Sequence, residues 1–291
     1  MSDANISERL DLATADRDEA ARLIARVALA AGPEAMASYG EAPRARAKSD
    51  GSPVTEADER AEAAIRDRLA AWAAPIPIVA EEATAAGAPI AIGERFLLVD
   101  PLDGTREFLA RNGEFTINVA LIERGRPIAG AVYAPALARL WFAGVRAFAC
   151  EAAVGADLPP PGAWRLLTTR AAPAGLVALA SRSHGDAETE AFLAGLPIGE
   201  RRSAGSSLKF CLIAEGEADV YPRFGPTMEW DTAAGDAVLR AAGGATLTIG
   251  GGPLGYGKLA SGLRNGAFVA WGDPNAAGGG IVNGPSIGDK R

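Results

Sequence analysis

Histidine is nearly absent from this chain of 291 residues, since His184 is the only one. A Ser-His-Asp triad or a histidine-rich zinc site would therefore depend on one side chain. Cysteine is also scarce: Cys150 and Cys211 lie far apart in the sequence and fit neither a disulfide framework nor a zinc cluster. We expect both to be buried thiols of a cytosolic protein. Any chemistry is expected to depend on carboxylates instead.

The chain also lacks an excess of basic charge and any long apolar run. Its formal net charge is −7, whereas proteins that bind nucleic-acid phosphates are normally basic. A small phosphorylated ligand stays compatible, because a bound metal can reverse the local sign of charge. No stretch approaches the ~18 uninterrupted apolar residues of a membrane span, and the polar beginning of the chain is unlike a secretory signal. We expect a cytoplasmic protein without nucleic-acid partner or transmembrane segment; peripheral binding at the inner membrane stays open.

The composition is that of an ordinary globular protein, with 48% hydrophobic and 22% charged residues. The length fits two packed subdomains, and the Pro-rich segment "GADLPPPGAW" predicts a boundary between residues 1–160 and 161–291. Helical spacing and strand-like runs predict two helices with largely antiparallel strands in the first part, and alternating strands and helices in the second. The expected helices of the first part cover 16–39, which Gly32-Pro33 would break or kink, and 54–72, with Thr55 as N-cap and Asp58 closing a capping box.

Acidic residues stand at the ends of several of these expected elements: Asp50, Glu81, Glu82, Asp100, Asp103 and Asp231. Strand ends in a mixed sheet commonly project into one crevice, so these groups could converge. Clustered carboxylates repel one another unless a cation neutralises them. Oxygen ligands without His or Cys select Mg²⁺ before Ca²⁺ or Mn²⁺. Two such ions about 3.5–4 Å apart would clamp the attacking water and the leaving oxygen of a phosphoester.

The segment "DPLDGT" has the clearest local chemistry. Pro101 is expected to stop the pairing of the preceding strand, and the turn can direct Asp100, the Leu102 carbonyl and Asp103 at one metal. Gly104 and Thr105 would then begin a helix whose N–H groups form an anion site. Taken singly, each motif has a structural interpretation as a solvated turn, a helix cap or a surface pair. The ordered set favours the functional one.

This ordered set resembles the inositol monophosphatase superfamily of Mg²⁺-dependent, Li⁺-sensitive phosphatases. The matching segments are "KSDGSPVTEAD" at 48–58, "VAEE" at 79–82, "DPLDGT" at 100–105 and "WDTAAGDAVLRAAGG" at 230–244. The segments "ASRSH" and "GSSLKFCLIAEGEADVYPRFGPTMEWDTAAG" are similar to the CysQ-type branch, the 3'(2'),5'-bisphosphate nucleotidases. The resemblance implies a layered αβαβα sandwich. It also implies hydrolysis of adenosine 3',5'-bisphosphate to AMP and phosphate, in sulfur assimilation, by a monomer or homodimer.

The resemblance further implies roles for individual residues. Two or three Mg²⁺ ions would be held by Glu81, Asp100, the Leu102 carbonyl, Asp103 and Asp231. Water would be activated by Asp50, Glu81 and Thr105 without a covalent phosphoenzyme, with support from Lys48, Thr55, Asp58 (which would steady Thr105) and Glu82. The substrate would contact Gly104, Thr105, Ser181, His184, Ser206, Lys209, Arg223 and Asp231. Lys209 and Arg223 would supply cations to a second phosphate. His184 is equally well a surface loop residue, and Lys48 a solvated charge.

Three other functions stay open at this point. A haloacid dehalogenase-type enzyme would use a phosphoaspartate, but the step from Asp100 to Asp103 is one residue longer than its signature. An inositol or other sugar monophosphate could be the substrate on the same fold. A metal-binding scaffold without turnover is the non-enzymatic alternative.

Overall fold

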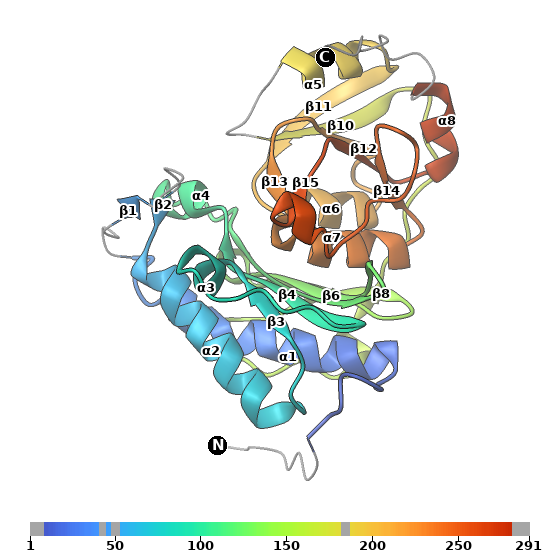
Figure 1. Cartoon of the computed structure of the whole chain (residues 1–291). Coiled ribbons are helices and arrows are strands. Elements are labelled where there is room, and N and C mark those ends of the chain that lie inside the picture. Colours follow the sequence, from blue (N-terminus) through green and yellow to red (C-terminus); the bar gives the residue numbers. More distant parts are fainter. Residues whose placement is uncertain (1–8, 41–44, 48–52, 182–186, 281–291) are drawn as a thin grey trace.

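The computed structural model describes residues 9–40, 45–47, 53–181 and 187–280. Its first half is built on a seven-stranded sheet whose strand order follows the chain (Figure 1). The strands are β3 (Ile78–Ala80), β4 (Arg95–Asp103), β5 (Thr116–Glu123), β6 (Arg126–Ala134), β7 (Arg139–Ala143), β8 (Ala147–Glu151) and β9 (Arg165–Leu166). Strands β3 and β4 run parallel, and the later neighbours are antiparallel. The central strands β5 and β6 are buried at nearly every position because both faces of the sheet are covered.

A second sheet has the order β11-β10-β12-β16-β14. Its strands are β10 (Leu176–Ser181), β11 (Ile198–Ala204), β12 (Val220–Arg223), β14 (Ala245–Thr248) and β16 (Phe268–Trp271). Two short pairs complete the described strands: β1 (Arg46–Ala47) with β2 (Pro53–Val54), and β13 (Thr227–Met228) with β15 (Arg264–Asn265). The chain passes between the two large sheets after Leu166 and before Leu176. The expected boundary between 1–160 and 161–291 stays a prediction.

Helices separate and cover these sheets. The α-helices are α1 (Arg17–Met36), α2 (Glu56–Trp72), α3 (Glu81–Ala85), α4 (Thr105–Leu109), α5 (Ala187–Ala194), α6 (Leu208–Ala214), α7 (Trp230–Ala241) and α8 (Ala277–Gly280). Short 3₁₀ turns are η1 (Pro135–Leu137), η2 (Pro161–Ala163), η3 (Leu259–Ser261) and η4 (Pro274–Ala276). Among the described residues, no helix is long and apolar enough to cross a membrane.

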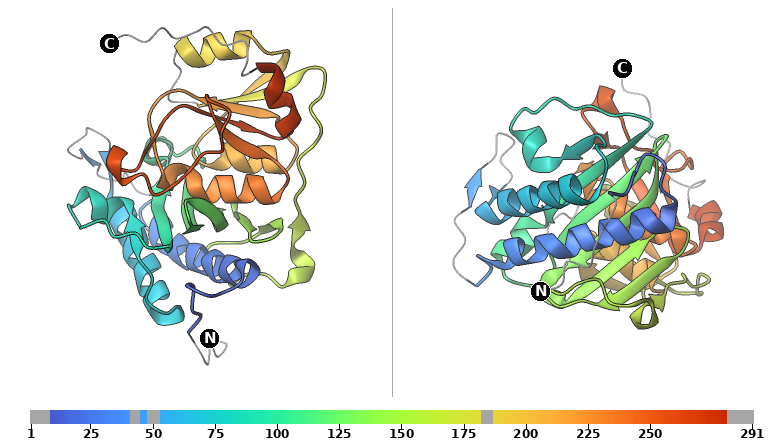
Figure 2. Two further views of the ribbon diagram at one scale, coloured as in Figure 1. Left: turned by 45° about the vertical axis from the view of Figure 1, so that its right-hand side comes forward. Right: turned by 90° about the horizontal axis from the view of Figure 1, so that it is seen from below.

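The elements stack in five layers. Helices α1 and α2 cover the outer face of the seven-stranded sheet, and α6 and α7 lie between that sheet and the second one (Figures 1 and 2). Helices α5 and α8 cover the far side of the second sheet. Apolar side chains fill each interface, for example Ile24 and Ile65 in the outer core and Phe210 and Val238 in the central one. The predicted αβαβα arrangement is confirmed.

Most expected elements are present, but Pro33 does not break its helix and Pro101 does not end the pairing of its strand. Helix α1 continues through Pro33 to Met36, because its buried face extends to Ala35 and this burial outweighs the hydrogen bond lost at proline. Strand β4 continues past Pro101; its pairing with β5 skips two positions and resumes at Asp103. Helix α7 begins at Trp230 with Glu229 as N-cap residue, so Asp231 lies inside the first turn.

Candidate active site

A cavity of about 240 Å³ opens where the end of β4 meets α4, α6 and α7. Residues from both halves of the chain line it. Those predicted from the sequence are Glu81, Asp103, Gly104, Thr105, Ser181, Ser206, Lys209, Arg223 and Asp231. Asp100 and Leu102 are almost fully buried just before this wall, on the last part of β4. The structure therefore brings most of the predicted site into one place.

Asp103 is held in the cavity wall by three donors, two from β5 and one from the start of α6. Its Oδ2 accepts hydrogen bonds from the Ser207 N–H at 2.7 Å, from Asn118 Nδ2 at 3.3 Å and from the Thr116 hydroxyl at 3.5 Å. Burial raises the pKa of Asp103 from 3.8 to about 6, although the charge of Lys209 and the Ser207 hydrogen bond lower it. The cavity thus holds a carboxylate that is costly to ionise without a further cation.

Asp231 reaches the same cavity from the first turn of α7. Its Oδ2 accepts the Met228 N–H at 2.8 Å, and its backbone carbonyl accepts the Ser207 hydroxyl at 2.7 Å. Burial raises the pKa of Asp231 well above the ordinary range, and the charges of Asp103 and Glu81 raise it further. Ser207 therefore connects the two aspartates, one from each half of the chain.

Asp100 is the third buried aspartate of this acidic group. It is 1% exposed, and its Oδ1 accepts the Leu102 N–H at 3.0 Å. Burial raises its pKa well above the ordinary range, and the charges of Glu81, Asp103 and Asp231 add to this. Glu81 begins α3 directly after β3 and lines the cavity. The Leu102 carbonyl stays a predicted ligand.

The donor set fits a hard divalent cation. In the described part of the chain, no three carboxylate, histidine or cysteine side chains lie close enough to enclose a metal ready-made. The fit rests instead on electrostatics: burial raises the pKa values of Asp100, Asp103 and Asp231, and repulsion from neighbouring carboxylates adds to it, so a cation would favour their charged forms. Each of these carboxylates also uses only one oxygen in hydrogen bonds to described residues, which leaves the other available as a ligand. All donors are oxygens, the type that Mg²⁺ prefers.

A hydrogen-bonded group supports the Thr105 side of the cavity. The Thr105 hydroxyl donates to Asp58 Oδ1 at 3.3 Å. The other Asp58 oxygen accepts the Thr55 N–H at 2.8 Å and its hydroxyl at 2.6 Å. This is the predicted capping box of α2, so the start of that helix fixes the Thr105 side chain.

The beginning of α3 is fixed in a similar way by a residue that sequence analysis missed. Glu62 of α2 is 5% exposed, and its carboxylate accepts the N–H groups of Glu82 at 2.8 Å and Ala83 at 3.1 Å. A carboxylate at a helix N-terminus is favourable because it meets unpaired N–H groups there. Glu62 thereby fixes the short helix that carries Glu81.

Gly104 is the point where only glycine fits. Its φ is +91°, a conformation that costs other residues free energy. A Cβ at this position would lie 2.2 Å from the Ser206 Oγ. The Ser206 hydroxyl is shared between the carbonyls of Asp103 at 2.7 Å and Glu114 at 2.8 Å, so it joins two parts of the protein. If Ser206 also contacts the substrate, as predicted, the same hydroxyl would serve the substrate as well as these two carbonyls.

Two cationic side chains are buried in the wall of the same cavity. Lys209 is 4% exposed, and its ammonium donates to the carbonyls of Ala204 and Ser206 at 3.1 and 2.7 Å. Burial lowers the pKa of Lys209 to about 8. Arg223 is 7% exposed and donates to the Pro226 carbonyl at 3.0 Å, but its Nε has no hydrogen-bond partner among the residues that the structure describes. An unpaired buried guanidinium nitrogen is costly, and an anionic ligand would satisfy it.

Several residues of this region did not enter the sequence prediction. The cavity is also lined by Pro53, Arg106, Glu107, Phe210, Tyr221, Pro226, Thr227 and Thr232. Ser207 directly follows Ser206 in "GSSLK", but sequence alone does not say that its N–H meets the Asp103 carboxylate and its hydroxyl the Asp231 carbonyl. Conversely, the predicted residues Lys48, Asp50 and His184 lie outside the described residues, and Ser181 is the last described residue of β10.

Known proteins are similar to this chain in sequence and in fold. The inositol monophosphatase family model matches residues 12–276. The 3'(2'),5'-bisphosphate nucleotidase CysQ of Shigella flexneri is 46% identical over 224 residues, which cover 77% of this chain and 87% of that protein. The crystal structure of CysQ from Bacteroides thetaiotaomicron is 39% identical with a TM-score of 0.73, covering 87% of this chain and 97% of that one. An inositol monophosphatase from Zymomonas mobilis, 23% identical, has a TM-score of 0.71 over 92% and 98% of the two chains.

Proposed function

Because the chain belongs to the inositol monophosphatase family, we propose that it is a Mg²⁺-dependent 3'(2'),5'-bisphosphate nucleotidase. It would hydrolyse adenosine 3',5'-bisphosphate to AMP and phosphate, as the names of its CysQ relatives indicate. The family match argues against the haloacid dehalogenase alternative and its phosphoaspartate. The same match makes a scaffold without turnover the weaker alternative.

The observation that carries the choice of substrate is the position of two buried cations. Lys209 and Arg223 line the cavity that also contains Asp103 and Asp231. A substrate with two phosphates could place one at the carboxylate side and the other at Lys209 and Arg223, where charge-assisted hydrogen bonds are strong. An inositol monophosphate has no second phosphate for these groups. Its binding would leave the Arg223 Nε unpaired.

Glu81, Asp100, Asp103 and Asp231, with the Leu102 carbonyl, would hold two or three Mg²⁺ ions. When bound, the metal would supply charge neutralisation for the phosphate and a bound water of lowered pKa. Thr105 would orient that water through its hydroxyl, whose own proton is directed to Asp58. The backbones of Gly104 and Thr105 would face the reacting phosphate. Asp50, outside the described residues, would share in water activation by the family pattern.

We place the reaction in the cytoplasm, in sulfur assimilation. Cys150 and Cys211 are free thiols and both are buried, which suits a reducing compartment. The formal net charge of −7 argues against nucleic acid as a partner.

A substrate panel with Mg²⁺ tests the proposal. We expect kcat/KM for adenosine 3',5'-bisphosphate to exceed that for inositol 1-phosphate by about tenfold or more, because the second phosphate gains charged partners. AMP, which lacks the 3'-phosphate, serves as the control for release from the 5' position. A preference for inositol 1-phosphate of the same size would show a sugar phosphatase instead. If no phosphomonoester releases phosphate, the protein would instead be a metal-binding scaffold without turnover.

A further inference from the structure

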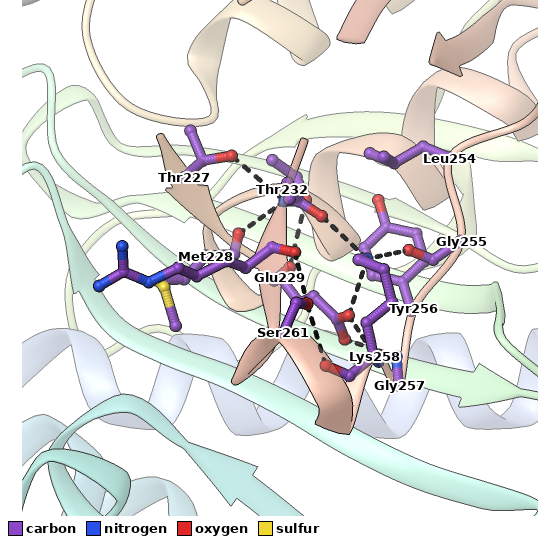
Figure 3. Close-up of polar contacts among 12 residues, drawn as sticks. Thr227, Met228, Glu229, Thr232, Leu254, Gly255, Tyr256, Gly257, Lys258 and Ser261 are labelled. Atoms are coloured by element: carbon purple, nitrogen blue, oxygen red, sulfur yellow. Dashed lines mark hydrogen bonds and ion pairs between the residues drawn. The ribbon is translucent and has the colours of Figure 1, made fainter. Parts of the chain in front are cut away.

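The segment that contains η3 packs across the beginning of α7 and is tied to it by a buried carboxylate (Figure 3). Glu229, the N-cap residue of α7, is 0% exposed. Its Oε2 accepts the Gly257 N–H at 2.6 Å, and its Oε1 accepts the Lys258 N–H at 2.9 Å. The same Oε1 forms an ion pair with the Lys258 ammonium at 2.7 Å.

The Glu229–Lys258 ion pair joins the two segments at a cost in desolvation free energy. The Glu229 carboxylate is fully buried, while the Lys258 side chain is 34% exposed. Taking the carboxylate out of water costs free energy that its attraction to the ammonium only partly returns, and apolar residues of similar size often serve stability equally well. Neither Glu229 nor Lys258 is among the residues that line the cavity. The pair therefore has a use other than substrate contact, and its neighbours indicate which.

Hydrogen bonds lead from the pair to Asp231. The Lys258 ammonium donates to Asn265 Oδ1 at 3.1 Å, and Asn265 Nδ2 donates to the Met228 carbonyl at 2.9 Å. On its other side, the Met228 N–H donates to Asp231 Oδ2 at 2.8 Å. Lys258 and Asn265 thus hold the Met228 carbonyl. The Met228 N–H, on the other side of the residue, orients the Asp231 carboxylate.

A second connection starts from Glu229 itself. Its N–H donates to the Leu263 carbonyl at 2.9 Å, and its carbonyl accepts the N–H and hydroxyl of Thr232, each at 3.2 Å. The Thr232 hydroxyl also accepts from Asn265 Nδ2 at 3.0 Å. Glu229 and Thr232, which stand on either side of Asp231 in the sequence, are consequently fixed by the same group, and Thr232 lines the cavity.

We propose that Glu229 and Lys258 are positioning residues, whose ion pair holds Asp231 in the orientation that binds the divalent cation. Without the pair, the segment around Lys258 and Asn265 would separate from Met228, and the Asp231 carboxylate would lose its fixed direction. The inference rests on the proposed function only for the role of Asp231 as a metal ligand. It does not depend on which phosphate ester is hydrolysed.

Binding of Mn²⁺ to the metal-free full chain, followed by the EPR signal of the free ion, tests this role. Mn²⁺ accepts the same oxygen ligands as Mg²⁺. We expect K258M and E229Q to weaken Mn²⁺ binding by about tenfold, the size found for groups that orient metal ligands. K258R keeps the charge and should restore most of the affinity. Because a lone buried carboxylate can prevent folding, the double variant E229Q/K258M removes both charges together and should still bind Mn²⁺ weakly.

The matched control is R240M, at the other end of the same helix. Arg240 pairs with the fully buried Asp236 at 2.8 Å and donates to the Leu254 carbonyl, so it also ties α7 to the same segment. R240M should lower the melting temperature but leave Mn²⁺ affinity within about twofold of the wild type. Wild-type affinity in folded E229Q/K258M, or an equal loss in R240M, would overturn the inference. A wild-type protein that binds Mn²⁺ but does not hydrolyse the bisphosphate would refute the proposed substrate and leave this inference intact.

Discussion

Replacing Asp103 by asparagine should make the metal-free protein more stable while abolishing its turnover. The pKa of Asp103 is raised from 3.8 to about 6, chiefly by burial. Above pH 6 the wild-type protein therefore keeps a charge in a place that favours the neutral form. Asparagine has nearly the same shape, remains neutral, and can still accept the Ser207 N–H through its amide oxygen. It cannot serve as an anionic metal ligand.

The size of the stabilisation follows from the pKa shift. A shift of one unit corresponds to about 1.4 kcal/mol, so the change from 3.8 to about 6 sets an upper limit of about 3 kcal/mol. Asp103 is partly exposed, and solvent screening reduces this to on the order of 2 kcal/mol. For a chain of this length, the melting temperature should rise by about 4 °C.

Thermal unfolding with a chelator present, at pH 8 and at pH 5, measures the effect. The folded wild-type protein binds the Asp103 proton more tightly than the unfolded chain, so its stability falls as pH rises from about 4 to about 6. D103N should consequently melt higher than the wild type at pH 8, and the difference should shrink at pH 5. Added Mg²⁺ should raise the melting temperature of the wild type much more than that of D103N. A variant that is less stable than the wild type at pH 8 would refute the reasoning.

Four further outcomes are expected. T105A should lower kcat by about 100-fold with little change in KM, because the hydroxyl held by Asp58 orients water; an unchanged kcat in steady-state assays would contradict this. R223M should raise KM for the bisphosphate by about tenfold without affecting inositol 1-phosphate, as initial rates would reveal. G104A should cost about 2 kcal/mol or more in denaturant unfolding, given its φ of +91° and the nearby Ser206. At limiting Mg²⁺ the rate should fall as pH drops through about 6, and saturating Mg²⁺ should move that midpoint lower.

Local patterns in the sequence predicted most helices and strands. Such patterns are strong where a side chain determines the geometry of the backbone around it. The Thr55–Asp58 capping box was readable as a short-range pattern, and it is confirmed. The bounds were less predictable where tertiary packing outweighs propensity. Pro33 does not end α1, since the helix face beyond it is buried. Pro101 does not end β4, because pairing resumes at Asp103.

The predicted carboxylates were recognisable because ordered motifs at strand and helix ends have few other uses. The groups that support them carried no such signal. Glu62 lies within an ordinary amphipathic helix, and only the fold shows that it caps α3. Glu229 and Lys258 are separated by a long segment, and a charged pair at that spacing predicts nothing by itself. Charged residues that act through tertiary contacts are invisible until the contacts are known.

The start of α6 explains how the two halves of the site act together. Ser207 donates its N–H to Asp103 and its hydroxyl to the Asp231 carbonyl, and Asn118 donates to both Asp103 and Ser207. The first turn of the same helix carries Lys209. Because one short helix fixes both carboxylates and this cation, the spacing between the expected metal and the second phosphate is set by local backbone geometry rather than by the packing of the two sheets. Substrate selection should therefore be insensitive to small shifts between the two sheets. It should be lost if α6 began at a different residue.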